Sequence, residues 1–488
     1  MLSPTFPAAK RVPAALLAIL LLAVGLRLHH LGTTSLWTDE LFTRYYPRLG
    51  LGFLWGEGRT LEPTPPLYYS VILGWTALVG DGAFALRLPS VAGSMLGIVL
   101  AYLLARELLE SPRAWLLAPL LLALTPTSIF YAQEARTYAL QGAAIALAML
   151  GFARYLRAPG KSALALYVVG AVLAIHLHLT SALFVAAVNL AALASLAGPG
   201  RLLDRTAFLR WCAANALVAL ACLPLLPILL SPVTVNATTW IGPTTRWSVE
   251  RTFAITLLGP AVQDNLLFYG EIGFVVVAAL ALLPPWRPGR RALTVLAAVP
   301  LIFIVLIVGI SFGKPVLITR TAAWLCIPLA LVLGDILARR FRLLAVAGIG
   351  LACAAAALHV ARVDGLKEDW KGLLQGLPGL APPALVVLAP HTPPGAVADY
   401  APGAGQPERI AGDFAPTIET TTIPAMFGTP TLAPDALAAA IAQGRPVWLL
   451  VRRPDYDWLE QLLAGLPPPR ANIPDGPGRN PALRAVGW

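Results

Sequence analysis

Ionisable residues stand beside the ends of several long apolar stretches in this sequence, a position where charge is costly and usually functional. Asp39 and Glu40 follow the first stretch, and Glu134 and Arg136 follow the third. Further residues of this kind are Arg87, His176, His178, Lys314 and Arg320. If the stretches cross a membrane in alternating directions, all of these side chains fall at one face, where they can converge on a single cavity.

Carboxylates and cations at a membrane face suit the transfer of a group from a phosphate to a hydroxyl. A carboxylate can take the proton of the hydroxyl, while Arg and Lys stabilise the negative charge of the departing phosphate. A lipid-linked phosphate presents its headgroup at this depth. A water-soluble nucleotide donor would need a Gly-rich phosphate-binding loop between a strand and a helix, which the sequence lacks. The pattern therefore favours a lipid phosphate.

Each of these residues also has an ordinary structural explanation when it is taken alone. Adjacent Asp39 and Glu40 could be solvated or cap a helix, and Glu134 and Arg136 could form a simple salt bridge. The histidines could be interfacial, and Arg320 could extend to lipid headgroups. Their joint placement favours function. Metal binding stays open, because a divalent cation is compatible with Asp39, Glu40, Glu134 and His178, although no tight ligand spacing is present.

The composition indicates which elements must position these residues. Of 488 residues, 57% are hydrophobic and only 12% are charged, against about a quarter charged in soluble domains. The mean hydropathy is +0.72. These values exclude a single soluble domain and a disordered chain, and they indicate a polytopic membrane protein. The four cysteines lie in or beside apolar runs and predict small apolar filler rather than a disulfide framework.

Apolar runs long enough to cross a bilayer, which needs about 20 residues and at least roughly 17, predict about eleven transmembrane helices. The runs are 13–31, 88–105, 114–131, 137–153, 162–178, 180–197, 211–230, 267–286, 292–312, 321–338 and 343–360. The first is predicted to be an uncleaved span, because Arg27 stands where a signal peptide would have small residues. Segment 65–79 is shorter, begins with Pro-Pro, and predicts an interfacial or re-entrant helix.

Basic residues concentrate in alternate loops, and the positive-inside rule then places the N-terminus in the cytoplasm. If 65–79 were a full span, every later basic cluster would fall outside, so the same rule excludes that reading. The net charge of +11 is thereby explained by topology and not by a nucleic-acid partner. External regions of real length are 32–87, 231–266 and everything after 360.

The predicted organisation is a transmembrane domain over 1–360 and a small extracytoplasmic α/β domain over 361–488. The second has strand-like runs at 384–389 and 446–451, and the latter leads into an amphipathic helix pattern at 457–463. The Pro- and Gly-rich stretches between 390 and 436, and after 466, predict loops.

The order of short motifs resembles the polytopic GT-C glycosyltransferases, in the branch with bacterial relatives of protein O-mannosyltransferases and the lipid A aminoarabinose transferase (glycosyltransferase family 39-like). The matching pieces are Leu36-Trp37-Thr38-Asp39-Glu40, Pro65-Pro66-Leu67-Tyr68-Tyr69, Ala85-Leu86-Arg87-Leu88-Pro89, Gln133-Glu134-Ala135-Arg136-Thr137-Tyr138, His178, Arg320 and Glu368-Asp369-Trp370-Lys371. Two departures are Thr64 before the Pro-Pro pair, where relatives often have His or Lys, and Thr321, where relatives commonly have Tyr.

This resemblance implies an inverting transfer of one sugar from a polyprenyl-phosphate donor to an acceptor outside the cytoplasm. Asp39 would be the general base, and Glu40 would shape the acceptor site. The remaining roles would be donor-phosphate binding by Arg136, Arg320, Lys314 and Arg87, and cavity lining by Glu134, Tyr68, Tyr69, Tyr138 and His178. The implied location is the bacterial inner membrane, with the C-terminal domain periplasmic or extracellular.

Two other functions remain open at this point. A transporter or flippase of lipid-linked saccharides is the main alternative, although transporters often show internal repeats and midplane polar residues that are not evident here. The chain could also be an assembly scaffold whose external domain binds a partner. The acceptor could be a glycolipid, a polysaccharide or a protein.

Overall fold

The computed structural model describes residues 11–196, 202–231, 241–261, 291–339, 342–411, 422–474 and 482–488. By internal contacts the chain divides into two compact units. The first, here called the helical unit, comprises Met1–His29, Pro63–Tyr68 and Arg87–Ala361. The second, here called the loop–tail unit, comprises His30–Glu62, Tyr69–Leu86 and Arg362–Trp488. It therefore joins much of the predicted first external loop to the tail.

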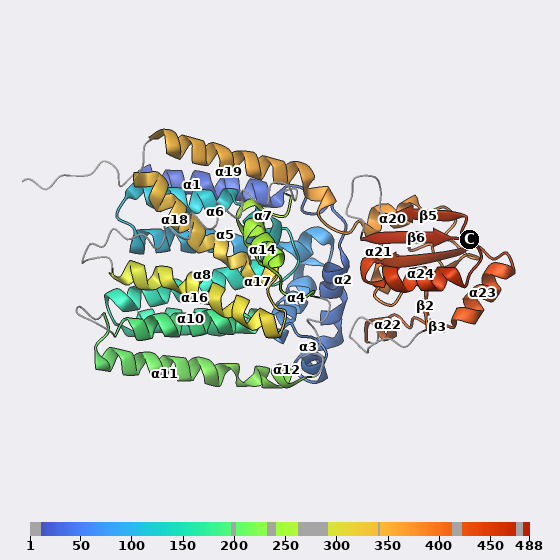
Figure 1. The fold of residues 1–488 in the computed structure, drawn as a ribbon, viewed down its shortest axis with the longest axis horizontal. Coiled ribbons are helices and arrows are strands. Elements are labelled where there is room, and N and C mark those ends of the chain that lie inside the picture. The colour runs from blue at the N-terminus through green and yellow to red at the C-terminus, as the bar shows by residue number, and fades with distance from the viewer. Residues whose placement is uncertain are drawn as a thin grey trace, which may run out of the picture. The chain divides into compact units, whose positions relative to one another are not determined.

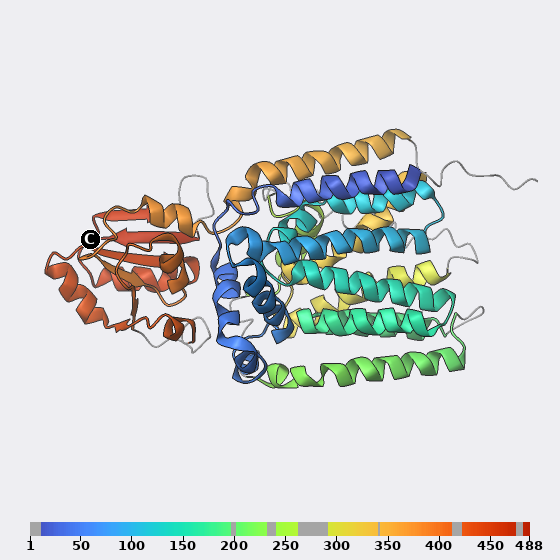
Figure 2. The same ribbon diagram turned by 180° about the vertical axis from the view of Figure 1, so that it is seen from behind.

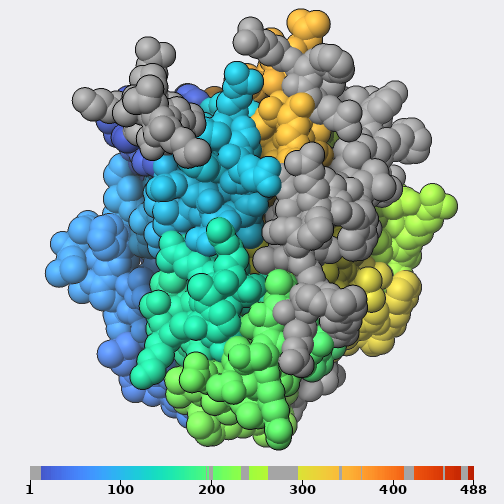
Figure 3. Space-filling view, turned by 90° about the vertical axis from the view of Figure 1, so that its left-hand side faces the viewer, coloured from blue at the N-terminus to red at the C-terminus, as the bar shows by residue number. Residues whose placement is uncertain are grey.

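Helices build the helical unit, and its long helices lie roughly parallel (Figures 1 and 2). They are α1 (Arg11–Leu28), α5 (Ala83–Leu108), α6 (Pro112–Leu124), α7 (Pro126–Ala132), α8 (Tyr138–Arg157), α9 (Lys161–Leu177), α10 (Ser181–Ala194), α11 (Arg205–Cys222), α12 (Leu226–Leu230), α14 (Arg246–Leu258), α16 (Arg291–Gly313), α17 (Thr319–Ala322), α18 (Cys326–Arg339) and α19 (Arg342–Arg362). Figure 3 looks onto the end of this unit that carries the α5–α6 and α8–α9 connections.

Among the residues that the structure describes, six helices are long and apolar enough to cross a membrane, or seven if the bent pair α6–α7 counts as one span. Three of the predicted spans form shorter apolar helices, Pro13–Leu28, Lys161–Leu177 and Ser181–Leu193. Predicted span 267–286 lies outside the described residues. A multi-pass helical architecture is confirmed, while the number eleven stays a prediction. Segment 65–79 forms the 14-residue helix α4 (Pro66–Val79), and its interfacial placement also stays a prediction.

Small residues let the central helices of this unit approach closely. A Cβ atom on Gly151 of α8 would lie 2.3 Å from the Tyr167 backbone nitrogen of α9. A Cβ atom on Gly170 of α9 would lie 2.4 Å from the Ala148 nitrogen of α8. Both positions require glycine, as is common where apolar helices pack without a hydrophobic driving force between them.

The loop–tail unit contains the remaining helices and a six-stranded sheet. The helical elements are α2 (Thr38–Tyr45), α3 (Gly50–Trp55), most of α4, α20 (Trp370–Gly376), α21 (Pro394–Tyr400), α22 (Thr422–Met426), α23 (Pro434–Ala442) and α24 (Tyr456–Ala464). The strands are β1 (Leu385–Leu388), β2 (Glu408–Ile410), β3 (Thr431–Leu432), β4 (Val447–Arg452), β5 (Ala471–Pro474) and β6 (Leu483–Gly487).

The strand order is β3-β2-β1-β4-β6-β5. The first four strands are parallel, while β6 is antiparallel to both β4 and β5. The predicted strands at 384–389 and 446–451 are confirmed as β1 and β4, and the predicted helix at 457–463 is confirmed within α24. Every residue of β1 is buried, as continuous apolar runs in a parallel sheet should be.

The loops predicted between 390 and 436, and after 466, are wrong in part. The described residues of these stretches include α21, β2 and β3, and also β5 and β6. Strands β2 and β3 have only three and two residues. Such short strands carry no periodic signal of their own, and pairing with β1 and with each other overrides their weak local propensity.

Candidate active site

The predicted acid pair lies in the first turn of α2. Asp39 is partly buried, whereas Glu40 is completely buried. Carboxylates are favoured there because the amide groups at a helix N-terminus carry partial positive charge. Lys367, itself buried, places its Nζ 3.3 Å from Glu40 Oε1. The fold therefore brings together two oppositely charged residues, one from the first loop and one from the tail.

Glu368, next to Lys367, contacts the start of the same helix. Its Oε2 accepts hydrogen bonds from the Thr38 backbone nitrogen at 3.0 Å and from Thr38 Oγ1 at 2.5 Å. Trp370 Nε1 also donates to this oxygen at 3.1 Å, and Arg452 Nε donates to Oε1 at 2.7 Å. The motif Glu368-Asp369-Trp370-Lys371 thus contacts the Trp37-Thr38-Asp39-Glu40 motif, a link that sequence reasoning missed.

Two further hydrogen bonds join first-loop residues to the tail within this unit, and a third lies within the first loop. Tyr400 OH accepts from the Leu36 nitrogen at 2.7 Å, and Ser35 Oγ accepts from the Lys371 nitrogen at 3.1 Å. Tyr69, one of the predicted cavity residues, is completely buried and donates from its OH to Glu62 Oε1 at 3.1 Å. Tyr69 is therefore bound to the first loop itself.

The other end of α2 is held by Asp399 of the tail. Arg44 Nη1 lies 2.7 Å from Asp399 Oδ2, and Tyr45 donates its OH to Asp399 Oδ1. Burial raises the pKa of Asp399 above its ordinary value, even though the Tyr45 hydroxyl and the Arg44 charge oppose that shift. Burial and the bond to Asp399 also raise the pKa of Tyr45, so this phenol stays protonated.

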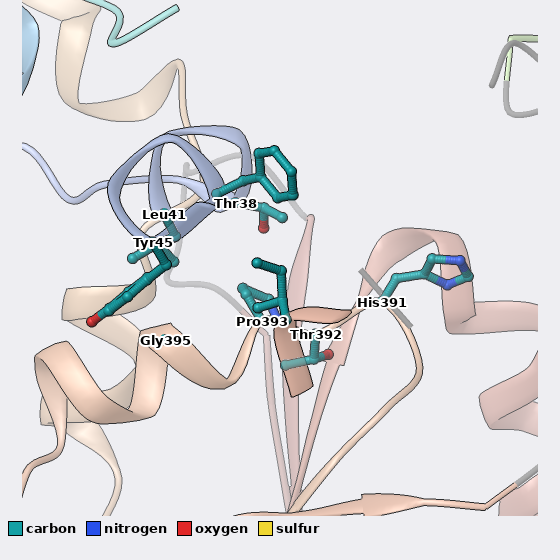
Figure 4. Close-up of a pocket in the computed structure, with 9 residues that line it drawn as sticks. Thr38, Leu41, Tyr45, His391, Thr392, Pro393 and Gly395 are labelled. Atoms are coloured by element: carbon teal, nitrogen blue, oxygen red, sulfur yellow. The ribbon is translucent and has the colours of Figure 1, made fainter. Parts of the chain in front are cut away.

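A small pocket lies between α2 and the loop that follows β1. Thr38, Leu41 and Tyr45 line one side, and His391, Thr392 and Pro393 line the other (Figure 4). Asp455 orients His391, since its Oδ1 lies 2.6 Å from His391 Nδ1. A Cβ atom on Gly395 would lie 2.5 Å from the Tyr45 ring, so this glycine permits the close approach of α21.

A second set of predicted residues meets in the helical unit. The Tyr131 and Tyr138 ring centroids are 5.2 Å apart, and the Tyr138 and His178 centroids are 5.8 Å apart. The charges of Arg136 and Arg320 both act on His178. Glu134 and Arg320, which carry opposite charges, both interact electrostatically with Tyr131. Ring contacts or electrostatic interactions thus link Glu134, Arg136, Tyr138, His178 and Arg320 through Tyr131 and His178, while their role as one site stays a prediction.

Arg27, which the sequence suggested only as a sign of an uncleaved span, is completely buried in this unit. It donates to Ser94 Oγ and Ser128 Oγ, both at 2.8 Å, and to the carbonyl oxygens of Ala123, Ala23 and Leu122 at 3.0, 3.3 and 3.5 Å. Ser94 and Ser128 also line a small pocket.

The break between α6 and α7 explains why Arg27 is needed. The two helices are bent by 59° at Thr125, and Pro126 has no N–H to donate to Leu122 O. Arg27 supplies that donor. A second set of hydrogen bonds joins the same two segments. Gln133 Nε2 at the end of α7 donates to the carbonyl oxygens of Leu26, Arg27 and His29 at the end of α1. These two contacts fix the turn that carries Glu134 and Arg136.

The other predicted residues of the helical unit differ in their burial. Arg87 and Tyr68 are completely buried, and Lys314 is partly buried. His176 Nε2 lies 3.0 Å from the Ala221 carbonyl oxygen, which favours a structural role against α11. No group of three or more His, Cys, Asp or Glu side chains suited to a metal ion occurs within the described parts of the chain. All four cysteines are free thiols in this structure.

The predicted site residues are thus divided between two units. Asp39, Glu40 and Tyr69 belong to the loop–tail unit, and the remaining predicted residues belong to the helical unit. Their convergence on one cavity stays a prediction.

Comparisons with known proteins test the predicted family. The model of the dolichyl-phosphate-mannose-protein mannosyltransferase family matches residues 63–228. A search of curated protein sequences finds no match. Among solved structures, ArnT from Cupriavidus metallidurans in the apo state has a TM-score of 0.61 at 13% identity, with 98% of each chain covered.

Two ligand-bound structures are also similar. ArnT from Cupriavidus metallidurans bound to undecaprenyl phosphate has a TM-score of 0.60 at 14% identity, again with 98% of each chain covered. The archaeal oligosaccharyltransferase AglB from Archaeoglobus fulgidus, in complex with an inhibitory peptide and a dolichol-phosphate, has a TM-score of 0.53 at 15% identity, covering 93% of this chain and 70% of that one. The resemblance predicted from the motifs is confirmed: the chain has the GT-C fold and resembles the membrane glycosyltransferases of that superfamily.

Proposed function

We propose that this chain transfers a single sugar, with inversion, from a polyprenyl-phosphate donor to a hydroxyl or similar acceptor. The transfer takes place at the extracytoplasmic face of a bacterial inner membrane. The observation that carries the proposal is that two cations of the helical unit, Arg136 and Arg320, both act electrostatically on His178, whose ring contacts Tyr138. Two cations at the end of membrane-length helices suit a lipid phosphate, and ArnT, a protein of similar fold, is known with undecaprenyl phosphate bound.

In the proposed reaction the oxygen of the acceptor hydroxyl bonds to the anomeric carbon of the sugar. At the same time, the carboxylate of Asp39 takes the proton of that hydroxyl. The bond between that carbon and the phosphate oxygen breaks, and the polyprenyl phosphate leaves with the bonding electrons. Arg136 and Arg320, assisted by Lys314 and Arg87, stabilise its growing charge.

The other predicted residues have supporting roles in this proposal. Glu40 shapes the acceptor site. Its buried ion pair with Lys367 supports that role, because a carboxylate paired with a cation does not compete with Asp39 for the proton of the acceptor hydroxyl. The cavity is lined by Glu134, Tyr68, Tyr69, Tyr138 and His178. The acceptor is a glycolipid, a polysaccharide or a protein. The proposal also includes eleven transmembrane spans and a domain boundary between residues 360 and 361.

The test compares Asp39→Asn with Glu57→Gln. Glu57 is an exposed acid of the same first loop, so its substitution removes the same charge away from α2. Each variant is returned to a strain that lacks the gene, and envelope glycans are quantified by mass spectrometry. We expect Asp39→Asn to lower transfer on the order of a hundredfold or more, the usual value of a general base, and Glu57→Gln to leave it unchanged.

Undiminished transfer by a folded Asp39→Asn protein would refute the proposed base. A purified chain that moves a polyprenyl-phosphate sugar across a vesicle membrane, without forming a glycosidic bond, would instead support the transporter alternative.

A further inference from the structure

The helix that carries the proposed base does not cap its own N-terminus. The N-cap residue of α2 is Trp37, whose side chain makes no capping hydrogen bond. Its indole N–H can donate but cannot accept, so it could not bind the first-turn amides in any orientation. Those amides nevertheless need acceptors when a helix begins inside a protein.

Glu368 supplies the acceptor from the tail. Its Oε2 binds both the backbone nitrogen and the hydroxyl of Thr38, the first residue of α2. Glu368 is only 5% exposed, so its negative charge lies at the positive end of the helix with little water to screen it. Arg452 of β4 holds the other carboxylate oxygen, which anchors the contact to the central sheet.

Lys367 makes a second connection at the same turn. Its ammonium pairs with Glu40, two residues beyond Thr38, and both side chains are buried. Consecutive tail residues therefore bind the residues on either side of Asp39. Such a bracket restricts both the rotation of the first turn and its displacement along the helix axis.

We propose that Lys367 and Glu368 are positioning residues that set the first turn of α2 and so aim the carboxylate of Asp39. The tail is then an integral part of the active site and not a separate recruitment module. The catalytic consequence rests on the proposed function of Asp39, whereas the stabilisation of α2 by the tail does not.

The test follows hydrogen exchange of α2 amides in the full-length protein in lipid nanodiscs. We compare Glu368→Ala, Glu368→Gln and Glu460→Gln. Glu460 pairs with Arg484 at 3.0 Å within the same tail but is largely exposed, so it is the matched control. Glu368→Gln keeps the side-chain shape and an acceptor oxygen for Thr38, so it remains informative if Glu368→Ala does not fold.

We expect exchange in the peptide spanning α2 to quicken about tenfold or more in Glu368→Ala and by a smaller factor in Glu368→Gln. Exchange in β1 should stay unchanged, because that strand is buried in the sheet and does not depend on Glu368. The kcat of sugar transfer in the same variants should fall by up to about a hundredfold, as expected for a misplaced catalytic group. The KM for the donor should change less than twofold.

Each outcome decides one part of the proposal. Unchanged α2 exchange in both Glu368 variants overturns it, and so does faster exchange with an unchanged kcat. Equal effects in Glu460→Gln would also overturn it, because they would show general loosening of the tail. Faster α2 exchange in the Glu368 variants, together with a wild-type chain that transfers no sugar, would refute the proposed function and leave the stabilisation of α2 by the tail standing.

Discussion

The two units hold their buried charges in different ways. In the helical unit, all five hydrogen bonds of Arg27 go to neutral carbonyl and hydroxyl oxygens. In the loop–tail unit, Lys367 and Arg452 pair with carboxylates, Glu40 and Glu368. The same kind of charged side chain is therefore satisfied by dipoles in one unit and by opposite charges in the other.

The difference follows from which backbone groups, carbonyl or N–H, each environment leaves without a backbone hydrogen bond. A proline-broken helix among apolar helices frees backbone carbonyl groups that no water can reach, and a guanidinium with five donors satisfies several of them at once. A helix N-terminus in the mixed unit offers free N–H groups instead, so it attracts carboxylates, which in turn need cations. Free backbone carbonyl groups thus favour a buried cation, and free backbone N–H groups favour a buried carboxylate.

The largest effect should come from breaking the buried ion pair. Lys367→Met removes the cation beside Glu40, and loss of one partner from a buried pair typically costs about 3–5 kcal/mol. Thermal unfolding in detergent measures this. Lys371→Met is the matched control, because Lys371 is exposed and four residues away. If the two variants melt alike, the Lys367–Glu40 pair does not stabilise the unit.

Removing the dipole-held charge should cost somewhat less. Arg27→Leu leaves the carbonyls of Leu122 and Ala123 without their Arg27 donor in a buried setting, which we expect to cost about 2–4 kcal/mol. The measurement is unfolding of the purified chain by titrated denaturing detergent. Arg113→Leu, at an exposed position of α6, should change little. Equal loss in both variants would contradict a specific role for Arg27.

Pro126→Ala should partly rescue Arg27→Leu. The new backbone N–H can donate to Leu122 O and close the gap between α6 and α7, which should recover about 1 kcal/mol, the net value of one hydrogen bond. In the wild-type background the same substitution should not add stability, since Arg27 already binds that carbonyl. A gain of the same size in both backgrounds would show that the two residues are not coupled.

The smallest effect concerns a partly exposed carboxylate of the loop–tail unit that pairs with two arginines. Asp81 binds Arg48 and Arg44. Burial alone would raise its pKa, but the hydrogen bonds and charges of these arginines outweigh burial and lower it below 3.8. A lowered folded-state pKa gives stability above pH 3.8 that is lost as the pH falls through the folded value.

Asp81→Asn should therefore flatten the acid side of the stability profile by less than about 1 kcal/mol, with a smaller difference in 1 M salt than in dilute buffer. Melting temperatures across the acid range measure it. An unchanged acid profile in the variant would show that the pair contributes nothing.

Much of the fold could be predicted because apolar run length is a local property. The runs at 384–389 and 446–451 are long enough to identify β1 and β4 without knowledge of their neighbours. Strands β2 and β3 were missed because they exist only through pairing with β1 and with each other. The places of Arg136, Tyr138 and His178 beside helix ends could be predicted because each residue lies at the end of an apolar stretch.

By itself the sequence determined a multi-pass helical protein with ionisable residues beside its apolar segments, because hydropathy and residue position need no partner. Only the tertiary structure decided which of these residues meet. Lys367 and Glu40 are 327 positions apart, and Glu368 and Thr38 are 330 apart. No periodicity links such distant residues. Their pairing depends on where the folded tail places Lys367 and Glu368 relative to α2.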